Sequence, residues 1–146
     1  MIPKIFKAVW FLSLIGFMMI FMYVYASLPE NVVFSDATDA VVASRDLVFY
    51  LSVTVVAVVN ALVFVVSKLY KRSDGTFSAW FYGQIILLNF FFCTVVGFVY
   101  LLNSGEKFSY DRLGIVIYGS ISLIVLWSIG LPIYQISRRF SSKQAI

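Results

Sequence analysis

Residues 25–50, YASLPENVVFSDATDAVVASRDLVFY, interrupt a chain that is otherwise almost continuously apolar. Pro29 cannot continue a helix, because it lacks an N–H group and its ring clashes with the preceding turn. Glu30, Asp36 and Asp39 would be costly in hydrocarbon, so they keep the segment in water or among lipid headgroups. The stretch therefore predicts a loop between two membrane-spanning helices, and we expect it to let those two helices pack as an antiparallel pair.

The composition on either side of this loop is that of a membrane protein. Of the 146 residues, 62% are hydrophobic and 12% are charged, against roughly 25% charged in an average soluble domain. A helix of about 20 apolar residues crosses a hydrocarbon core roughly 30 Å thick. The uncharged runs that reach this length are residues 8–29, 47–67, 75–105 and 113–137.

The distribution of Lys and Arg predicts the orientation of the chain. These residues gather in the short cytoplasmic segments of membrane proteins. Here most of them lie before residue 8, at 68–72 and after residue 137, whereas the other two connections hold most of the acidic residues. Both termini are therefore expected in the cytoplasm.

The expected fold class is an all-α integral membrane protein with four transmembrane helices and a single domain spanning residues 1–146. Short links between successive spans make an up-down-up-down bundle the simplest topology. The helices are expected near residues 5–27, 46–69, 79–103 and 113–137. The expected connections are external loops at 28–45 and 104–112, a cytoplasmic turn at 70–78 and a cytoplasmic tail at 138–146.

Local signals predict how the helices begin, end and bend. Ser44 is suited to cap the N-terminus of the second helix, and Gly105 is suited to end the third. Pro132 is expected to kink the fourth helix, because it leaves a carbonyl without its usual donor. Such a kink sets packing, and a hinge is the alternative interpretation.

The N-terminal run has a second interpretation, as a cleaved signal peptide. Lys4 and Lys7 would form its basic region, and Val24-Tyr25-Ala26 would be an acceptable cleavage pattern. The apolar run is longer than the core of a typical signal peptide. Retention as the first membrane span is therefore the expectation.

The residues needed for most membrane chemistry are missing from the sequence. It contains no His and a single Cys, and the only charged residues inside the predicted spans, Lys7, Asp46 and Lys68, lie within three residues of a span end. Haem ligation, iron–sulfur or zinc sites and self-contained proton coupling ordinarily require such groups. We therefore expect no enzymatic activity, no cofactor, no metal site and no nucleic-acid partner.

A few polar residues inside the spans are candidate contacts. Three of them follow an i, i+4, i+8 spacing on one face of the third helix, while a run of three Phe in that helix must turn at least one ring to lipid or to another subunit. Amides and small residues commonly join membrane helices, and a partner or ligand stripe is the alternative. The candidates are Asn60, Gln84, Asn89, Phe91, Cys93 and Gly97.

The first external loop resembles a known family. Tyr25 at the end of a span, then Leu28-Pro29-Glu30, an acidic segment and Ser44-Arg45-Asp46 are similar to a small membrane domain of bacterial peptide-toxin immunity proteins. The usual form of that domain has a second Pro and a His after the acidic step and a Gly in the acidic segment, all of which are lacking here. The resemblance covers about 30 residues and implies a bacterial inner membrane and no enzyme chemistry.

Three functions are compatible with these features. The first is an accessory or structural subunit of a larger membrane complex, in contact with lipids and other integral membrane subunits. The second is an immunity-type or signalling protein, whose acidic residues Glu30, Asp36 and Asp39 meet a cationic peptide outside the membrane. The third is an oligomeric small transporter or channel, which would need a path lined by Asn60, Gln84, Asn89 and Ser122.

Overall fold

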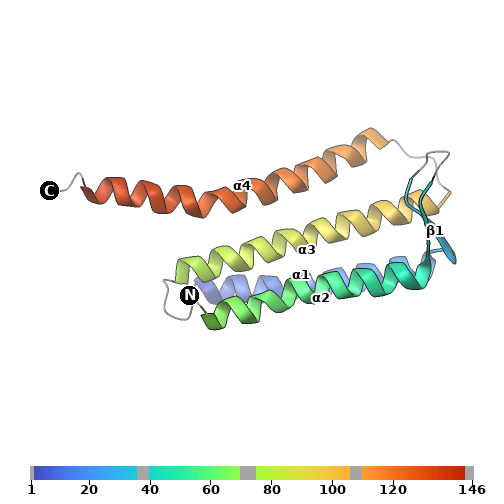
Figure 1. Ribbon diagram of the computed structural model, residues 1–146, viewed down its shortest axis with the longest axis horizontal. Coiled ribbons are helices and arrows are strands. Elements are labelled where there is room, and N and C mark those ends of the chain that lie inside the picture. Colours follow the sequence, from blue (N-terminus) through green and yellow to red (C-terminus); the bar gives the residue numbers. More distant parts are fainter. Residues whose placement is uncertain (1, 36–39, 70–74, 106–109, 144–146) are drawn as a thin grey trace.

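The computed structural model describes residues 2–35, 40–69, 75–105 and 110–143. These residues form four long helices and one two-stranded antiparallel sheet (Figure 1). Successive helices run in opposite directions, so the N- and C-termini lie on the same side of the molecule, which we call the termini end (Figure 1). The sheet lies on the opposite side, which we call the hairpin end (Figure 1). The elements are α1 (Ile2–Ser27), β1 (Asn31–Val33), β2 (Val42–Ser44), α2 (Arg45–Leu69), α3 (Gly75–Asn103) and α4 (Tyr110–Lys143).

All four helices are long and apolar enough to cross a membrane. This confirms the prediction of four helices of membrane-spanning length and composition. The segments that meet both conditions are Lys4–Ser27, Arg45–Val66, Thr76–Asn103 and Arg112–Ser137.

The helices extend beyond their predicted ends, α3 and α4 most of all. α3 begins at Gly75, inside the turn expected at 70–78, and α4 continues to Lys143, through much of the tail expected at 138–146. An uncharged run shows where side chains suit hydrocarbon, whereas a helix ends only where its backbone hydrogen bonds stop. Charge positions therefore located the spans but underestimated the length of the helices.

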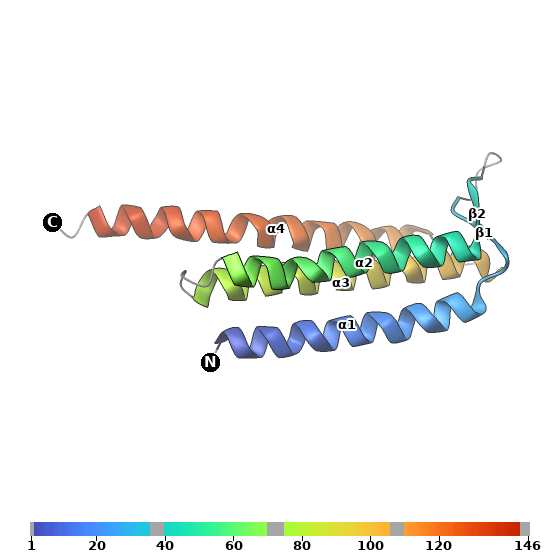
Figure 2. The same ribbon diagram turned by 60° about the horizontal axis from the view of Figure 1, so that its bottom comes forward.

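α3 is the central helix. Its backbone lies close to those of α1, α2 and α4, whereas α1 and α2 approach each other at few places (Figure 2). Among the described elements α4 approaches only α3, which lies between α4 and the other two helices (Figure 1). α1 and α2 run antiparallel and meet through side chains, as at Phe21 and Phe49, whose ring centroids lie 5.6 Å apart, but the backbone of α1 lies close to α3 over more of its length. A connection as long as the one between α1 and α2 constrains neighbours weakly, so side-chain packing decides which helices meet.

Apolar side chains between α1, α2 and α3 form three clusters. The first contains Trp10, Val63, Tyr82 and Ile85, near the termini end, and the second contains Phe17, Phe21 and Val56. The third, at the hairpin end, contains Val24, Leu28, Val32 and Val99. Lipid is as apolar as these side chains, so the clusters contribute close van der Waals packing more than hydrophobic burial.

The segment expected as a loop at 28–45 contains a two-stranded β-hairpin, a small addition to the predicted all-α fold. β1 and β2 pair antiparallel, with Val32 opposite Ala43. Val32 is 0% exposed and packs against Val24, Leu28 and Val99, which fixes the hairpin against the ends of α1 and α3. Strands of three residues are too short to show an alternating pattern, so the sequence did not predict them.

α4 is the least enclosed helix. Only 6% of its most apolar stretch is buried, against 17% in each of the other three spans. Pro132 lies inside it, and the helix changes direction along its length in Figure 1, as expected for an internal proline. α4 thus lies along α3 and leaves most of its surface uncovered by the described part of the chain.

Candidate functional site

Two amide side chains meet between α2 and α3. Asn60 Nδ2–H donates to Asn89 Oδ1 (2.8 Å), and Asn89 Nδ2–H donates to Asn60 Oδ1 (3.1 Å). Both residues are buried, Asn60 being 4% and Asn89 0% exposed. The two candidate contacts from different helices are therefore brought together inside the chain.

α1 completes this group with two further residues. Trp10 Nε1–H donates to Asn60 Oδ1 (2.8 Å), and Asn89 Nδ2–H also donates to the Ser13 hydroxyl (3.0 Å). Ser13 in turn donates to the Trp10 carbonyl (2.7 Å). We call Trp10, Ser13, Asn60 and Asn89 the amide cluster; it joins α1, α2 and α3 by side-chain hydrogen bonds.

The amide cluster uses its hydrogen-bonding capacity internally. The second N–H of Asn60 donates to the Val56 carbonyl (2.9 Å), so both of its donors are occupied, and its oxygen accepts from Trp10 and Asn89. Asn89 likewise uses both donors. An amide has two donors and two acceptor lone pairs, so little capacity is left for a ligand or a partner.

The other candidates on α3 lie in different surroundings. Cys93 is half-buried against the cluster of Phe17, Phe21 and Val56. Gly97 has open space where a Cβ would be, so it does not mark a close helix crossing. The Phe91 ring lies 6.2 Å from that of Phe92 and is half-buried. The i, i+4, i+8 stripe is thus not one continuous contact surface.

A second set of contacts attaches α4 to α3. Trp80 Nε1–H donates to the Trp127 carbonyl (2.7 Å), and Trp127 Nε1–H donates to the Trp80 carbonyl (2.9 Å). One turn along, the Ser128 hydroxyl lies 3.2 Å from Gln84 Oε1. A Cβ on Gly83 would lie 2.4 to 2.9 Å from atoms of the Trp127 indole, so only glycine admits that ring. The sequence analysis identified neither the Trp pair nor the role of Gly83.

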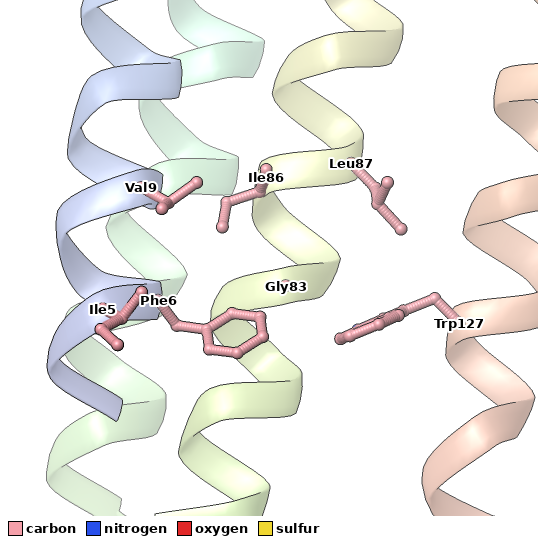
Figure 3. Close-up of a pocket in the computed structure, with 7 residues that line it drawn as sticks. All are labelled: Ile5, Phe6, Val9, Gly83, Ile86, Leu87 and Trp127. Atoms are coloured by element: carbon pink, nitrogen blue, oxygen red, sulfur yellow. The ribbon is translucent and has the colours of Figure 1, made fainter. Parts of the chain in front are cut away.

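An apolar groove opens beside this contact, at the termini end (Figure 3). Its volume is about 340 Å³. α1 forms one side and α3 the floor, and the Trp127 ring extends from α4 toward Phe6, with the two ring centroids 6.2 Å apart (Figure 3). The lining residues are Ile5, Phe6, Val9, Gly83, Ile86, Leu87 and Trp127.

The four polar residues that a transport path would need lie in separate places. Asn60 and Asn89 belong to the amide cluster, and Gln84 lies at the α3–α4 contact. Ser122 is exposed on α4 and donates to the Tyr118 carbonyl of its own helix. These four side chains do not line one path through the described chain.

At the hairpin end, Asn103 closes one edge of the sheet. Its Nδ2–H donates to the Val33 carbonyl (2.9 Å), and its Oδ1 accepts from the Val33 amide (2.9 Å). The side-chain amide thereby pairs with β1 as a neighbouring strand would. Sequence analysis treated Asn103 only as the end of a helix, because nothing local signals a partner 70 residues away.

The candidate acidic contacts are only partly visible. Glu30 is exposed, whereas Asp36 and Asp39 lie outside the described residues. Close by, the Arg45 guanidinium lies 5.3 Å from the centroid of the Tyr25 ring and donates to the Leu28 carbonyl (3.3 Å). These contacts hold the start of α2 against the end of α1. In the part of the chain that the structure describes, no three His, Cys, Asp or Glu side chains gather as a metal site would require.

Comparison with family models, with curated proteins and with solved structures finds no match to this chain. The resemblance of residues 25–46 to immunity-protein membrane domains therefore stays a prediction.

Proposed function

We propose that this protein is a non-catalytic integral membrane protein that acts by contact, as an accessory subunit of a larger complex in a bacterial cytoplasmic membrane. The observation that carries the proposal is the exposure of α4. This helix is attached along one side, at α3, and large apolar side chains make up most of its exposed surface. A fixed helix with a free face suits docking to another membrane subunit.

The contacts between α4 and α3 determine which side of α4 is exposed. The reciprocal Trp80 and Trp127 bonds and the close fit at Gly83 set which side of α4 faces α3. Large apolar side chains then point away from the chain, among them Ile115, Tyr118 and Leu126. We call this the α4 face. Its contacts with a partner would be van der Waals contacts, as is usual between membrane helices.

The inside of the chain supports a non-catalytic role. The polar groups of the amide cluster bond to one another, and the groove beside Trp127 is apolar. Catalysis needs a nucleophile, an acid or base, or polarising groups directed at a substrate. Neither location supplies such a set.

The proposal includes an orientation of the chain in the membrane. Both termini lie at one end of the molecule, and the sequence concentrates its Lys and Arg at that end. Under the positive-inside rule this end faces the cytoplasm, and the hairpin faces outward.

Site-specific photo-crosslinking in native membranes tests the α4 face. Leu126 on α4, Leu51 on α2 and Leu12 on α1 are matched in type and exposure, at 67%, 63% and 65%. We expect a photoreactive residue at 126 to capture one protein in high yield, and the same residue at 51 or 12 to capture mainly lipid. Lipid adducts alone at all three positions would contradict a partner on this face.

The hairpin favours a second candidate function, recognition of a cationic peptide outside the membrane. Val32 and Asn103 hold β1 against the ends of α1 and α3, and the acidic residues Asp36 and Asp39 follow β1 in the sequence. Changing Asp36 and Asp39 together to Asn should abolish protection of expressing cells against such a peptide. Lys107→Gln is the matched control in the other loop, and unchanged protection in the Asp36/Asp39 variant would end this idea.

A further inference from the structure

No described part of the chain fills the groove between α1, α3 and α4. We propose that it is a lipid-binding site, which takes one acyl chain of an anionic phospholipid from the leaflet at the termini end. This site is separate from the α4 face, and its occupancy does not depend on a partner subunit.

The lining determines which part of a ligand can enter. The side chains around the groove are aliphatic or aromatic, with Ile5, Val9 and Leu87 on its walls (Figure 3). The indole N–H groups of Trp80 and Trp127 are already bonded to carbonyls, so neither is available to a ligand. A polar headgroup or a quinone ring would find no donor here, whereas a hydrocarbon chain needs none.

The shape of the groove is set by a specific contact. Gly83 lets the Trp127 ring lie directly on α3, and the ring then extends toward Phe6 on α1. The backbones of α1 and α4 do not approach each other, so an open slot remains between these two helices. A volume of about 340 Å³ falls within the range of ligand sites between bundled helices.

The charge at this end indicates the headgroup. Lys4 and Lys7 are exposed in the same two turns of α1 that line the groove, although their positions lie on the opposite face of that helix. Lys68 is exposed at the end of α2. Long Lys side chains can bend toward the headgroup level. A phospholipid whose chain occupies the groove would therefore have cations around its phosphate, which favours an anionic lipid over a zwitterionic one.

Native mass spectrometry of the purified full-length chain tests this site. The chain is reconstituted in vesicles of equal parts phosphatidylglycerol and phosphatidylcholine, then extracted mildly. We expect one retained phosphatidylglycerol per chain. Val9→Phe, which fills the groove, should lower retention about tenfold, while Val58→Phe, the same change at an exposed position on α2, should leave it unchanged.

The charge of the headgroup is tested separately. In the Lys4→Gln, Lys7→Gln variant we expect one lipid still to be retained, with the preference for phosphatidylglycerol reduced. Unfolding temperature and size-exclusion profile show that each variant is folded; if Val9→Phe fails, Leu87→Phe replaces it. Equal retention by the groove-filling and control variants would overturn the proposal, as would a protein crosslinked from position 9 in native membranes.

Discussion

Asn60 is the residue on which the packing of three helices depends. Its side chain makes four hydrogen bonds, two of them to Asn89, one to Trp10 and one within its own helix. Interhelical hydrogen bonds in membrane proteins contribute about 0.6 to 2 kcal/mol each. Replacing only one of two bonded residues has a larger effect on stability, because the remaining buried polar group is then left without a hydrogen-bond partner.

A double-mutant cycle tests this cluster. Asn60→Leu should lower the free energy of unfolding by about 1 to 3 kcal/mol, because it leaves polar groups of Trp10 and Asn89 buried without their hydrogen-bond partner. The double change Asn60→Leu and Asn89→Leu should destabilise the protein by less than the sum of the two single changes. The reason is that the second change removes an amide that the first has already left without its partner. Thermal unfolding in detergent measures each step, and Ser122→Ala is the control. Strict additivity would show that the two amides do not interact.

Gly83 is decisive for the attachment of α4. Gly83→Ala would place a Cβ against the rigid Trp127 ring, so we expect a lower unfolding temperature and loss of the reciprocal Trp bonds. Gly130→Ala, on α4 with open space around it, should be neutral or stabilising, since Ala favours helix over Gly by about 1 kcal/mol. Thermal unfolding followed by Trp fluorescence reports on both variants. Equal shifts in the two would contradict the close fit.

Elements in this protein differ in how well the sequence anticipates them. The uncharged runs located all four spans, and local signals also held: the Leu47 amide donates to the Ser44 hydroxyl (3.3 Å), and Gly105 follows α3 with φ of 73°. The hairpin could not be predicted, because its stability comes from Val32 and Asn103 contacting parts of the chain distant in sequence. Local patterns carry no information on such contacts.

The anchoring of the hairpin is testable by hydrogen exchange. Asn103→Ala removes both bonds to Val33, so we expect faster exchange of the Val33 amide and of its neighbours in β1. Amides in the middle of α1 and α3 should exchange as in the unchanged protein, which provides the internal control. Unaltered exchange in β1 would mean that apolar packing at Val32 alone holds the hairpin.

At the scale of the whole molecule, α3 is the element that contacts the other three helices and the hairpin. Its N-terminal half binds α4 through Trp80 and Gly83, its middle binds α1 and α2 through Asn89, and its end binds the hairpin through Asn103. Polar residue types suggested Asn60, Gln84 and Asn89 as contacts. The sequence could not show that the two amides bond to each other, because many helix arrangements suit the same four apolar runs.

The orientation of the whole chain predicts which ends are accessible. With Cys93 replaced by Ala, a Cys introduced at position 30 should react in intact cells with a maleimide that cannot cross the membrane. A Cys introduced at position 143 should react only after the membrane is opened, because the positive-inside rule places that end in the cytoplasm. The reverse labelling pattern would invert the topology.

The central claim is that the protein works as a subunit of a larger complex. The most direct measurement is purification of the tagged, natively expressed protein in mild detergent, followed by sizing and mass spectrometry. The proposal predicts one integral membrane protein at a fixed stoichiometry, lost when the α4 face is altered by Leu126→Trp and kept with Leu51→Trp. A lone monomer or a homo-oligomer would contradict it and would favour the external hairpin as the functional surface.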